Sequence, residues 1–279
     1  MPLAVHAIRT GSVRIKTAQI RGQGHGLARQ LNIVRDRAWS DWLPTYAWLI
    51  DHPEGPILVD TGEARHLMDH AASWHPYLRW EVHFDIDADE EIGPKLKALG
   101  LSPRDLAKVV LTHLHVDHDG GLAHLQNVPI FLHAGELEAA KGVLGRIRGY
   151  LPNRWPRWFD PKPLSFEQGS HAQFPQRCNL TSDGAVFAVP TPGHTPHHVS
   201  VFARADPGAD RYVCMAGDTS YTQQLMVEGV VDGISGDEEQ SKSTLAQLRE
   251  FAASNSMIYL PTHDPDSERR LTSGETVKL

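Results

Sequence analysis

Short apolar runs separated by turn residues recur along the chain and predict a series of strands. The run TYAWLID, a Pro/Gly turn at 52–56 and the run ILVD predict a β-hairpin over residues 45–62. Further strands are expected in the N-terminal 16 residues and at KVVLTH, PIFL, AVFAVPT, HHVSVFAR, RYVCMAGD and MIYLPTH. Helices are predicted over 89–100, 135–147 and 237–254, with a short one after Ser102.

The predicted strands come in clusters instead of alternating strictly with helices. This order favours an α/β fold in which two mixed β-sheets pack face to face and helices flank them, an αββα sandwich. No repeat or linker divides the 279 residues, so a single domain over 1–279 is expected. Residues 145–180 are rich in proline and aromatic residues without a clear period, and we expect an irregular lid or pocket insertion there.

Composition excludes several classes of protein. The formal net charge is −7, which speaks against nucleic acid or an anionic membrane surface as partner. No apolar run is long enough to span a membrane, and the N-terminus does not resemble an export signal, so a cytoplasmic protein is expected. The two cysteines, Cys178 and Cys214, are not expected to form a disulfide.

The densest group of chemically active residues is THLHVDHDGG, directly after a predicted strand. In an extended chain His113 and His115 project to the same side and can share one metal ion. Asp117 and His118 add an oxygen and a nitrogen after the chain turns, and Gly120–Gly121 allow the backbone to turn tightly. The alternative is a histidine-rich surface loop.

Three more residues of ligating type each follow an apolar strand. His194 lies in AVPTPGH, Asp218 ends YVCMAGD, and His263 ends MIYLPTH. Strand ends that meet at one edge of a sandwich can place such side chains on a rigid scaffold. The sequence therefore predicts one metal centre built from four separate segments.

This pattern, together with VDTG at 59–62, resembles the metallo-β-lactamase superfamily over roughly 45–265. The resemblance implies two divalent metal ions, zinc by default with iron, cobalt or manganese as alternatives, and a bridging hydroxide that attacks the substrate. It implies that His113, His115 and His194 hold one ion, that Asp117, His118 and His263 hold the other, and that Asp218 bridges them. Asp60 would orient a ligand histidine.

Within that superfamily, D-T-S-Y at 218–221 and THDP at 262–265 resemble the N-acyl homoserine lactone lactonases. The resemblance implies a quorum-quenching hydrolase that opens a small-molecule lactone. Tyr221 would stabilise the oxyanion and Asp117 would return a proton to the leaving group. The alternatives are a lactonase or esterase for another substrate, such as 4-pyridoxolactone, an aryl ester or a phosphotriester, and a non-catalytic metal-binding sensor.

An acyl chain needs an apolar groove. The expected lining residues come from the proline- and aromatic-rich insertion and its surroundings, with the segment 39–46 as a further source: His133, Tyr150, Trp155, Trp158, Phe159 and Phe166. The same insertion is a candidate dimer contact, so a homodimer is also considered.

Overall fold

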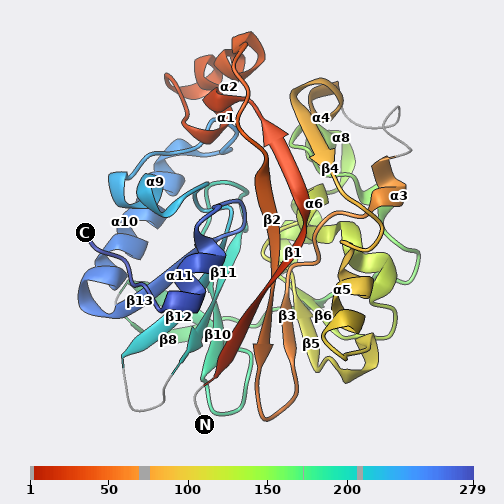
Figure 1. The fold of residues 1–279 in the computed structure, drawn as a ribbon. Coiled ribbons are helices and arrows are strands. Elements are labelled where there is room, and N and C mark those ends of the chain that lie inside the picture. Colours follow the sequence, from red (N-terminus) through yellow and green to blue (C-terminus); the bar gives the residue numbers. More distant parts are fainter. Residues whose placement is uncertain (1–2, 69–75, 172, 206–209) are drawn as a thin grey trace.

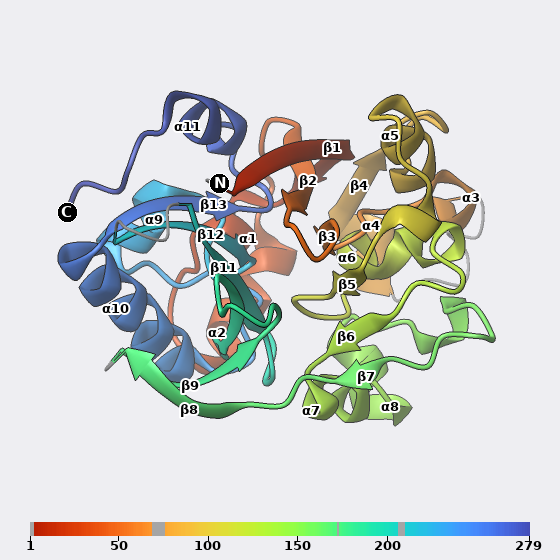
Figure 2. The same ribbon diagram turned by 90° about the horizontal axis from the view of Figure 1, so that it is seen from below.

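Two β-sheets face each other, with helices on their outer sides (Figure 1). The computed structural model describes residues 3–68, 76–171, 173–205 and 210–279. The predicted αββα sandwich is therefore confirmed. Seen along the sheets, the strands form two inner layers with α5 (Ile92–Ala98) outside one and α10 (Glu238–Ser254) outside the other (Figure 2).

The first sheet runs in the order β4-β1-β2-β3-β5-β6-β7. Its strands are β1 (Ala4–Ile15), β2 (Leu43–Asp51), β3 (Ile57–Val59), β4 (Val82–Asp85), β5 (Lys108–Val110), β6 (Ile130–Leu132) and β7 (Lys162–Pro163). The pairs β4·β1, β1·β2 and β2·β3 are antiparallel, whereas β3, β5, β6 and β7 are parallel. The predicted hairpin over 45–62 is formed by β2 and β3.

The second sheet runs in the order β13-β12-β11-β10-β9-β8. Its strands are β8 (Glu167–His171), β9 (Phe174–Asn179), β10 (Val186–Pro190), β11 (Val199–Arg204), β12 (Arg211–Gly217) and β13 (Ser256–Pro261). Only β12 and β13 pair in parallel among these described strands. Both sheets are thus mixed, as the clustering of strands in the sequence predicts.

The remaining elements are short. They are α1 (Thr17–Ile20), α2 (Gly26–Arg35), α3 (Arg65–Met68), α4 (Pro76–Glu81), α6 (Val116–Asp119), α7 (Ala134–Ala139), α8 (Gly142–Ile147), α9 (Gln223–Glu228) and α11 (Ser267–Ser273), with 3₁₀ turns η2 (Pro103–Asp105), η3 (Gly120–His124) and η4 (Pro152–Arg154). Figure 1 shows α2 and α4 at the upper end of the sandwich. None of the described helices is long and apolar enough to cross a membrane.

Alternating side chains of the strands supply both the central core and the outer cores. In β2, Trp48 and Ile50 belong to the cluster between the two sheets, whereas Leu49 packs toward the helices of the first sheet. In β12, Met215 faces the other sheet and Tyr212 faces α10. A strand that is buried on both faces has a continuous apolar sequence, which explains why these strands could be predicted.

Two predictions differ from the structure. The predicted helix over 135–147 is two helices, α7 and α8, and the φ of +73° at Gly142 marks the break between them. The segment 145–180, expected to be irregular, contains β7, β8 and β9 in its described part. β7 and β8 are edge strands, where polar residues and proline are tolerated, so they carry no apolar alternation that a sequence pattern could reveal.

Gly62, two residues beyond Asp60, packs against β1 at the turn that leaves β3. Its φ is +69°, and a Cβ there would lie 2.1 Å from the Thr10 hydroxyl oxygen. Thr10 is fully buried and donates a hydrogen bond to the Thr45 carbonyl, so it cannot move away freely. The Gly62 carbonyl also accepts from the Gly121 N–H, which ties this turn to the histidine-rich loop.

Replacing Gly62 by alanine should therefore lower the free energy of unfolding by about 3 kcal/mol, because backbone strain and a steric clash add. The matched control is Gly100→Ala, where φ is +77° and nothing lies within 4 Å of the added Cβ. The control should lose only about 1 kcal/mol, from the backbone strain alone. Urea denaturation of both variants checks this, and equal losses would show that the clash is relieved.

Candidate metal centre

The seven predicted ligands come together at the ends of four strands. His113, His115, Asp117 and His118 follow β5, either in the loop before α6 or within that helix, and the other three follow β10, β12 and β13. The described residues include three overlapping groups of ligand atoms suited to a metal ion: His113, His115 and His194; His113, His118 and Asp218; and Asp117, His118 and His263. All four segments that the sequence singled out contribute to one cluster.

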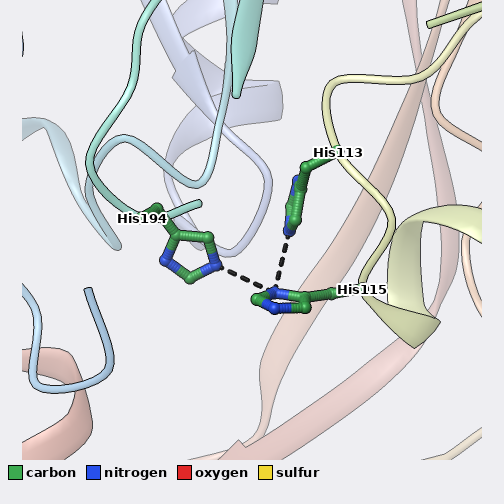
Figure 3. Close-up of side chains that lie close together, drawn as sticks. All are labelled: His113, His115 and His194. Carbon is green, nitrogen blue, oxygen red and sulfur yellow. Dashed lines mark hydrogen bonds between the residues drawn. The ribbon is translucent and has the colours of Figure 1, made fainter. Parts of the chain in front are cut away.

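Three imidazoles converge on one point (Figure 3). His115 Nδ1 lies 3.1 Å from His113 Nε2 and also 3.1 Å from His194 Nε2. Figure 3 shows His194 approaching from one side and His113 and His115 from the other, with dashed lines joining the His115 ring to each of the other two. A ring nitrogen carries either one proton or one lone pair, so this arrangement suits three lone pairs directed at a shared cation better than a hydrogen-bond network.

Asp117, His118 and His263 form a ligand group at the other end of the cluster. His263 Nε2 lies 3.3 Å from Asp117 Oδ2, and His118 Nε2 lies 3.9 Å from Asp117 Oδ1. Asp218 stands between the two groups: its Oδ1 is 3.3 Å from His118 Nε2, and its Oδ2 is 3.5 Å from both His194 Nε2 and His263 Nε2. This is the position expected of a carboxylate that bridges two ions.

A hydrogen bond on the outer side of each ring sets which nitrogen faces inward. His115 Nε2 donates to the Arg148 carbonyl and His263 Nδ1 donates to the Pro44 carbonyl, each at 3.0 Å. Carbonyl oxygens only accept, so the outer nitrogen of each ring carries a proton, and the inner nitrogen is the one that can bind a metal ion once it has lost its own proton. These two rings are therefore oriented for metal binding.

Carboxylates perform the same task for two other ligands. Asp60 Oδ2 lies 2.9 Å from His118 Nδ1, and Asp232 Oδ2 lies 3.3 Å from His194 Nδ1. Asp60 also accepts from the Thr112 N–H and hydroxyl, both at 2.8 Å, and is held at a φ of +60°. The Thr112 hydroxyl in turn lies 3.1 Å from His113 Nδ1. Asp60 thus lies where it can orient a ligand histidine.

Burial and mutual charge shift the pKa values strongly across the cluster. Burial lowers the pKa of His115 to about 4. Burial opposes ionisation of Asp117, but its hydrogen bond with His263 prevails and the pKa falls to about 2. For His263, burial is outweighed by Asp218 and Asp117, which raise its pKa to about 10. Protonated His263 thus supplies positive charge beside the two ionised carboxylates, and a bound cation would take the place of its inner proton.

The donor set fits two divalent cations. His118 Nε2 and Asp218 Oδ1 are buried and have no hydrogen-bond partner among the described residues, although buried polar atoms are nearly always paired. A metal ion between these two atoms would satisfy both. Imidazole nitrogen together with carboxylate oxygen is the ligand combination of zinc and of other borderline first-row metals.

A cavity of about 720 Å³ opens above the cluster. Its floor includes His115, Asp117, His194, Asp218 and His263. Tyr221 also lines it, with its ring stacked on that of His263 at a centroid distance of 5.7 Å. Burial raises the pKa of the Tyr221 phenol well above its usual value, so the hydroxyl keeps its proton and can act as a donor.

Comparison with known proteins agrees with this geometry. The family model of the metallo-beta-lactamase superfamily matches residues 40–263, which include every residue of the cluster. The chain belongs to this superfamily. The resemblance that the histidine motif carries is thereby confirmed.

Two relatives and one solved structure illustrate what the chain is similar to. An N-acyl homoserine lactonase from a Bacillus species is 29% identical over 231 residues, 81% of this chain and 84% of its own. The N-acyl homoserine lactonase AttM of Agrobacterium fabrum is 26% identical and covers 95% of this chain and 94% of its own. The structure of an N-acyl homoserine lactone hydrolase with N-hexanoyl-L-homoserine at its catalytic metal centre has a TM-score of 0.78, 23% identity and 96% coverage of both chains. At that identity the structural likeness shows the fold.

Of the residues expected to form the acyl groove, only Tyr150 lies in the described cavity wall. Trp155, Trp158 and Phe159 pack instead against the core beneath the first sheet. The Trp155 indole donates to Asp119 at 2.6 Å, which anchors this segment behind the metal-binding loop. Phe166 packs against the central core, so its place too differs from the expected one.

His133 likewise lies outside the described cavity lining. Its Nδ1 accepts from the Gly135 N–H at the start of α7, and its ring stacks on His197 with a centroid distance of 4.8 Å. The segment 39–46 does not contribute to the wall either. The apolar wall comes from β1, α2, α4 and β4, with single residues of α6 and α8: Val13, Ile15, Ile33, Val34, Leu78, Val82, Phe84, Val116 and Ile147.

Sequence reasoning missed Asp232 and left the role of His198 open, and the structure places both where they position ligands. Asp232 supports His194, and His198 Nε2 accepts from the Asp218 N–H at 3.1 Å. Asp232 lies in VVDGIS, which matches no motif. The only hint of a functional role in the sequence is that an acidic residue stands among apolar ones.

Replacing Asp232 by asparagine should weaken metal binding about 10- to 100-fold, because the amide no longer fixes the His194 proton on Nδ1. Competition with a chromogenic chelator measures this affinity. The matched control is Asp51→Asn, since Asp51 also contacts a histidine, His6, at 2.9 Å but outside the cluster. Unchanged affinity in the Asp232 variant would contradict the assigned role.

Proposed function

We propose that this protein is a metal-dependent hydrolase that opens the lactone ring of N-acyl homoserine lactones. The observation that supports it most is a seven-ligand cluster at the floor of a cavity whose wall is largely apolar and which Tyr221 also lines. The relatives described as N-acyl homoserine lactonases support the same substrate class.

The distances between the ligand atoms support two ligand sets. His113, His115 and His194 would hold one ion, and Asp117, His118 and His263 would hold the other, with Asp218 shared. When bound, the ions would supply an activated water and polarise the lactone carbonyl. Zinc is the default identity, and iron, cobalt and manganese suit the same ligands.

The side chains around the cluster provide the remaining steps. The Tyr221 hydroxyl, beside His263, donates a hydrogen bond to the substrate oxygen on which negative charge develops. Asp117 is ionised and its side chain is 15% exposed, so it can take up a proton from the attacking water and return it to the ring oxygen when the C–O bond breaks.

The apolar wall suits the acyl chain. Ile33 and Val34 of α2, Leu78 of α4 and Phe84 of β4 are among the residues that border the cavity away from the cluster. Burying a methylene group against such side chains contributes about 0.8 kcal/mol. The homoserine lactone ring would then lie over the cluster while the chain extends along this wall.

A substrate panel should identify the reaction. We expect metal-loaded protein to release protons from short- and long-chain N-acyl homoserine lactones faster than from a plain γ-lactone, 4-pyridoxolactone, a thioester or an aryl phosphotriester. Asp218→Asn serves as the metal-poor control and should lose both metal and activity. If the protein hydrolyses another member of the panel but no acyl homoserine lactone, this substrate class is excluded. Metal-dependent hydrolysis as such would still be supported.

Replacing Tyr221 by phenylalanine should reduce kcat about 100-fold, because the developing oxyanion loses a donor. Metal content, measured by elemental analysis, should stay the same because the hydroxyl is not a ligand. Tyr212→Phe is the control: its hydroxyl accepts from Arg204 in the second sheet, away from the cavity, and kcat should not change. An unchanged kcat in the Tyr221 variant would limit Tyr221 to packing.

A further inference from the structure

A chain of three polar side chains runs through the cavity wall at Tyr221. Gln19 Nε2 donates to the Tyr221 oxygen at 2.7 Å, and the Tyr77 hydroxyl donates to Gln19 Oε1. Gln19 and Tyr221 are each only 5% exposed, and the three side chains all border the cavity. None of the three is a metal ligand, and Gln19 stands in KTAQIRG without a motif.

The direction of these hydrogen bonds determines where the Tyr221 proton points. Because Tyr77 donates to the amide oxygen of Gln19, the amide presents its N–H groups to Tyr221. The Tyr221 oxygen accepts on that side, so its own O–H is directed away from Gln19. A phenolic O–H prefers the plane of its ring, which leaves one favoured direction.

We propose that Gln19 is a positioning residue that holds the Tyr221 hydroxyl with its proton free for the substrate. This inference rests on the proposed function, in which Tyr221 is the donor. Gln19 itself need not touch the substrate, and its effect passes through Tyr221. No proton leaves Gln19 during the reaction.

The backbone around Gln19 is fixed, as a positioning role requires. The Gln19 carbonyl accepts from the Gly233 N–H at 2.7 Å, and Asp36 Oδ2 accepts from the Ala18 N–H at 2.7 Å. A Cβ at Gly233 would lie 2.3 Å from the Ala18 carbonyl oxygen, which shows how closely the two segments pack.

Three variants test the proposal kinetically, with the substrate of the panel that the wild type hydrolyses. Gln19→Met keeps the size but removes the donor, and kcat should fall about tenfold with KM within about twofold. Gln19→Glu replaces the donor by an acceptor for the Tyr221 proton, and kcat should fall to the level of Tyr221→Phe. Adding Gln19→Met to Tyr221→Phe should cause little further loss, because both changes act through one hydroxyl.

Gln224→Met is the matched control, since Gln224 is an exposed amide on α9 that bonds only to Glu228 among the described residues, and its kcat should not change. Full activity of both Gln19 variants, or losses that multiply with Tyr221→Phe, would overturn the proposal.

An infrared measurement tests the role of Gln19 without any substrate. The infrared C–O stretching band of Tyr221, isolated by subtracting the spectrum of Tyr221→Phe, depends on whether the phenol oxygen accepts a hydrogen bond. It should shift in Gln19→Met and remain in place in Gln224→Met. An unshifted band would overturn the role of Gln19, whereas a wild type that opens no lactone would refute the proposed function alone.

Discussion

The outward hydrogen bonds of the histidines are the constraint on which the site depends. Each ring donates its one proton to an acceptor behind it, whether a main-chain carbonyl, as for His115 and His263, or a carboxylate, as for His118 and His194. The inner nitrogens then face one another and two carboxylates. The polar surroundings therefore orient the ligands toward a shared metal centre before any metal binds.

The metal-binding loops also join the two sheets. The Val199 N–H of β11 donates to the Thr112 carbonyl at the end of β5, and the Tyr46 N–H of β2 donates to the Thr262 carbonyl beyond β13. Both bonds cross from one sheet to the other next to a ligand histidine. The sandwich and the ligand cluster therefore stabilise each other, and the strain at Asp60, with its positive φ, is held by the contacts on both sides.

The parts predictable from sequence are those whose signal is local. Ligands such as His113 and Asp218 were visible because a polar residue at the end of an apolar strand has no role in the core. Asp232 and Gln19 were not, because their partners lie 38 and 202 positions away and no motif marks them. Edge strands and short helices were missed for the same reason. The position of Trp155 was wrong because a tryptophan flanked by arginine and proline gives the same sequence pattern whether it lines a cavity or packs behind a loop.

One short segment, residues 232–233, contacts both a metal ligand and the residue that bonds to Tyr221. Asp232 orients His194, and the next residue, Gly233, donates its N–H to the carbonyl of Gln19. The tautomer of a ligand and the direction of the Tyr221 hydroxyl are therefore set by adjacent residues of the same turn. A side chain at position 233 would collide with α1, which shows that the turn packs tightly on this helix. Asp232 and Gln19 therefore cannot move relative to each other unless this contact is broken. A rigid turn of this kind holds Tyr221 at a fixed position relative to the metal ligands, and in a catalytic site a misplacement of about 1 Å can cost about 100-fold in rate.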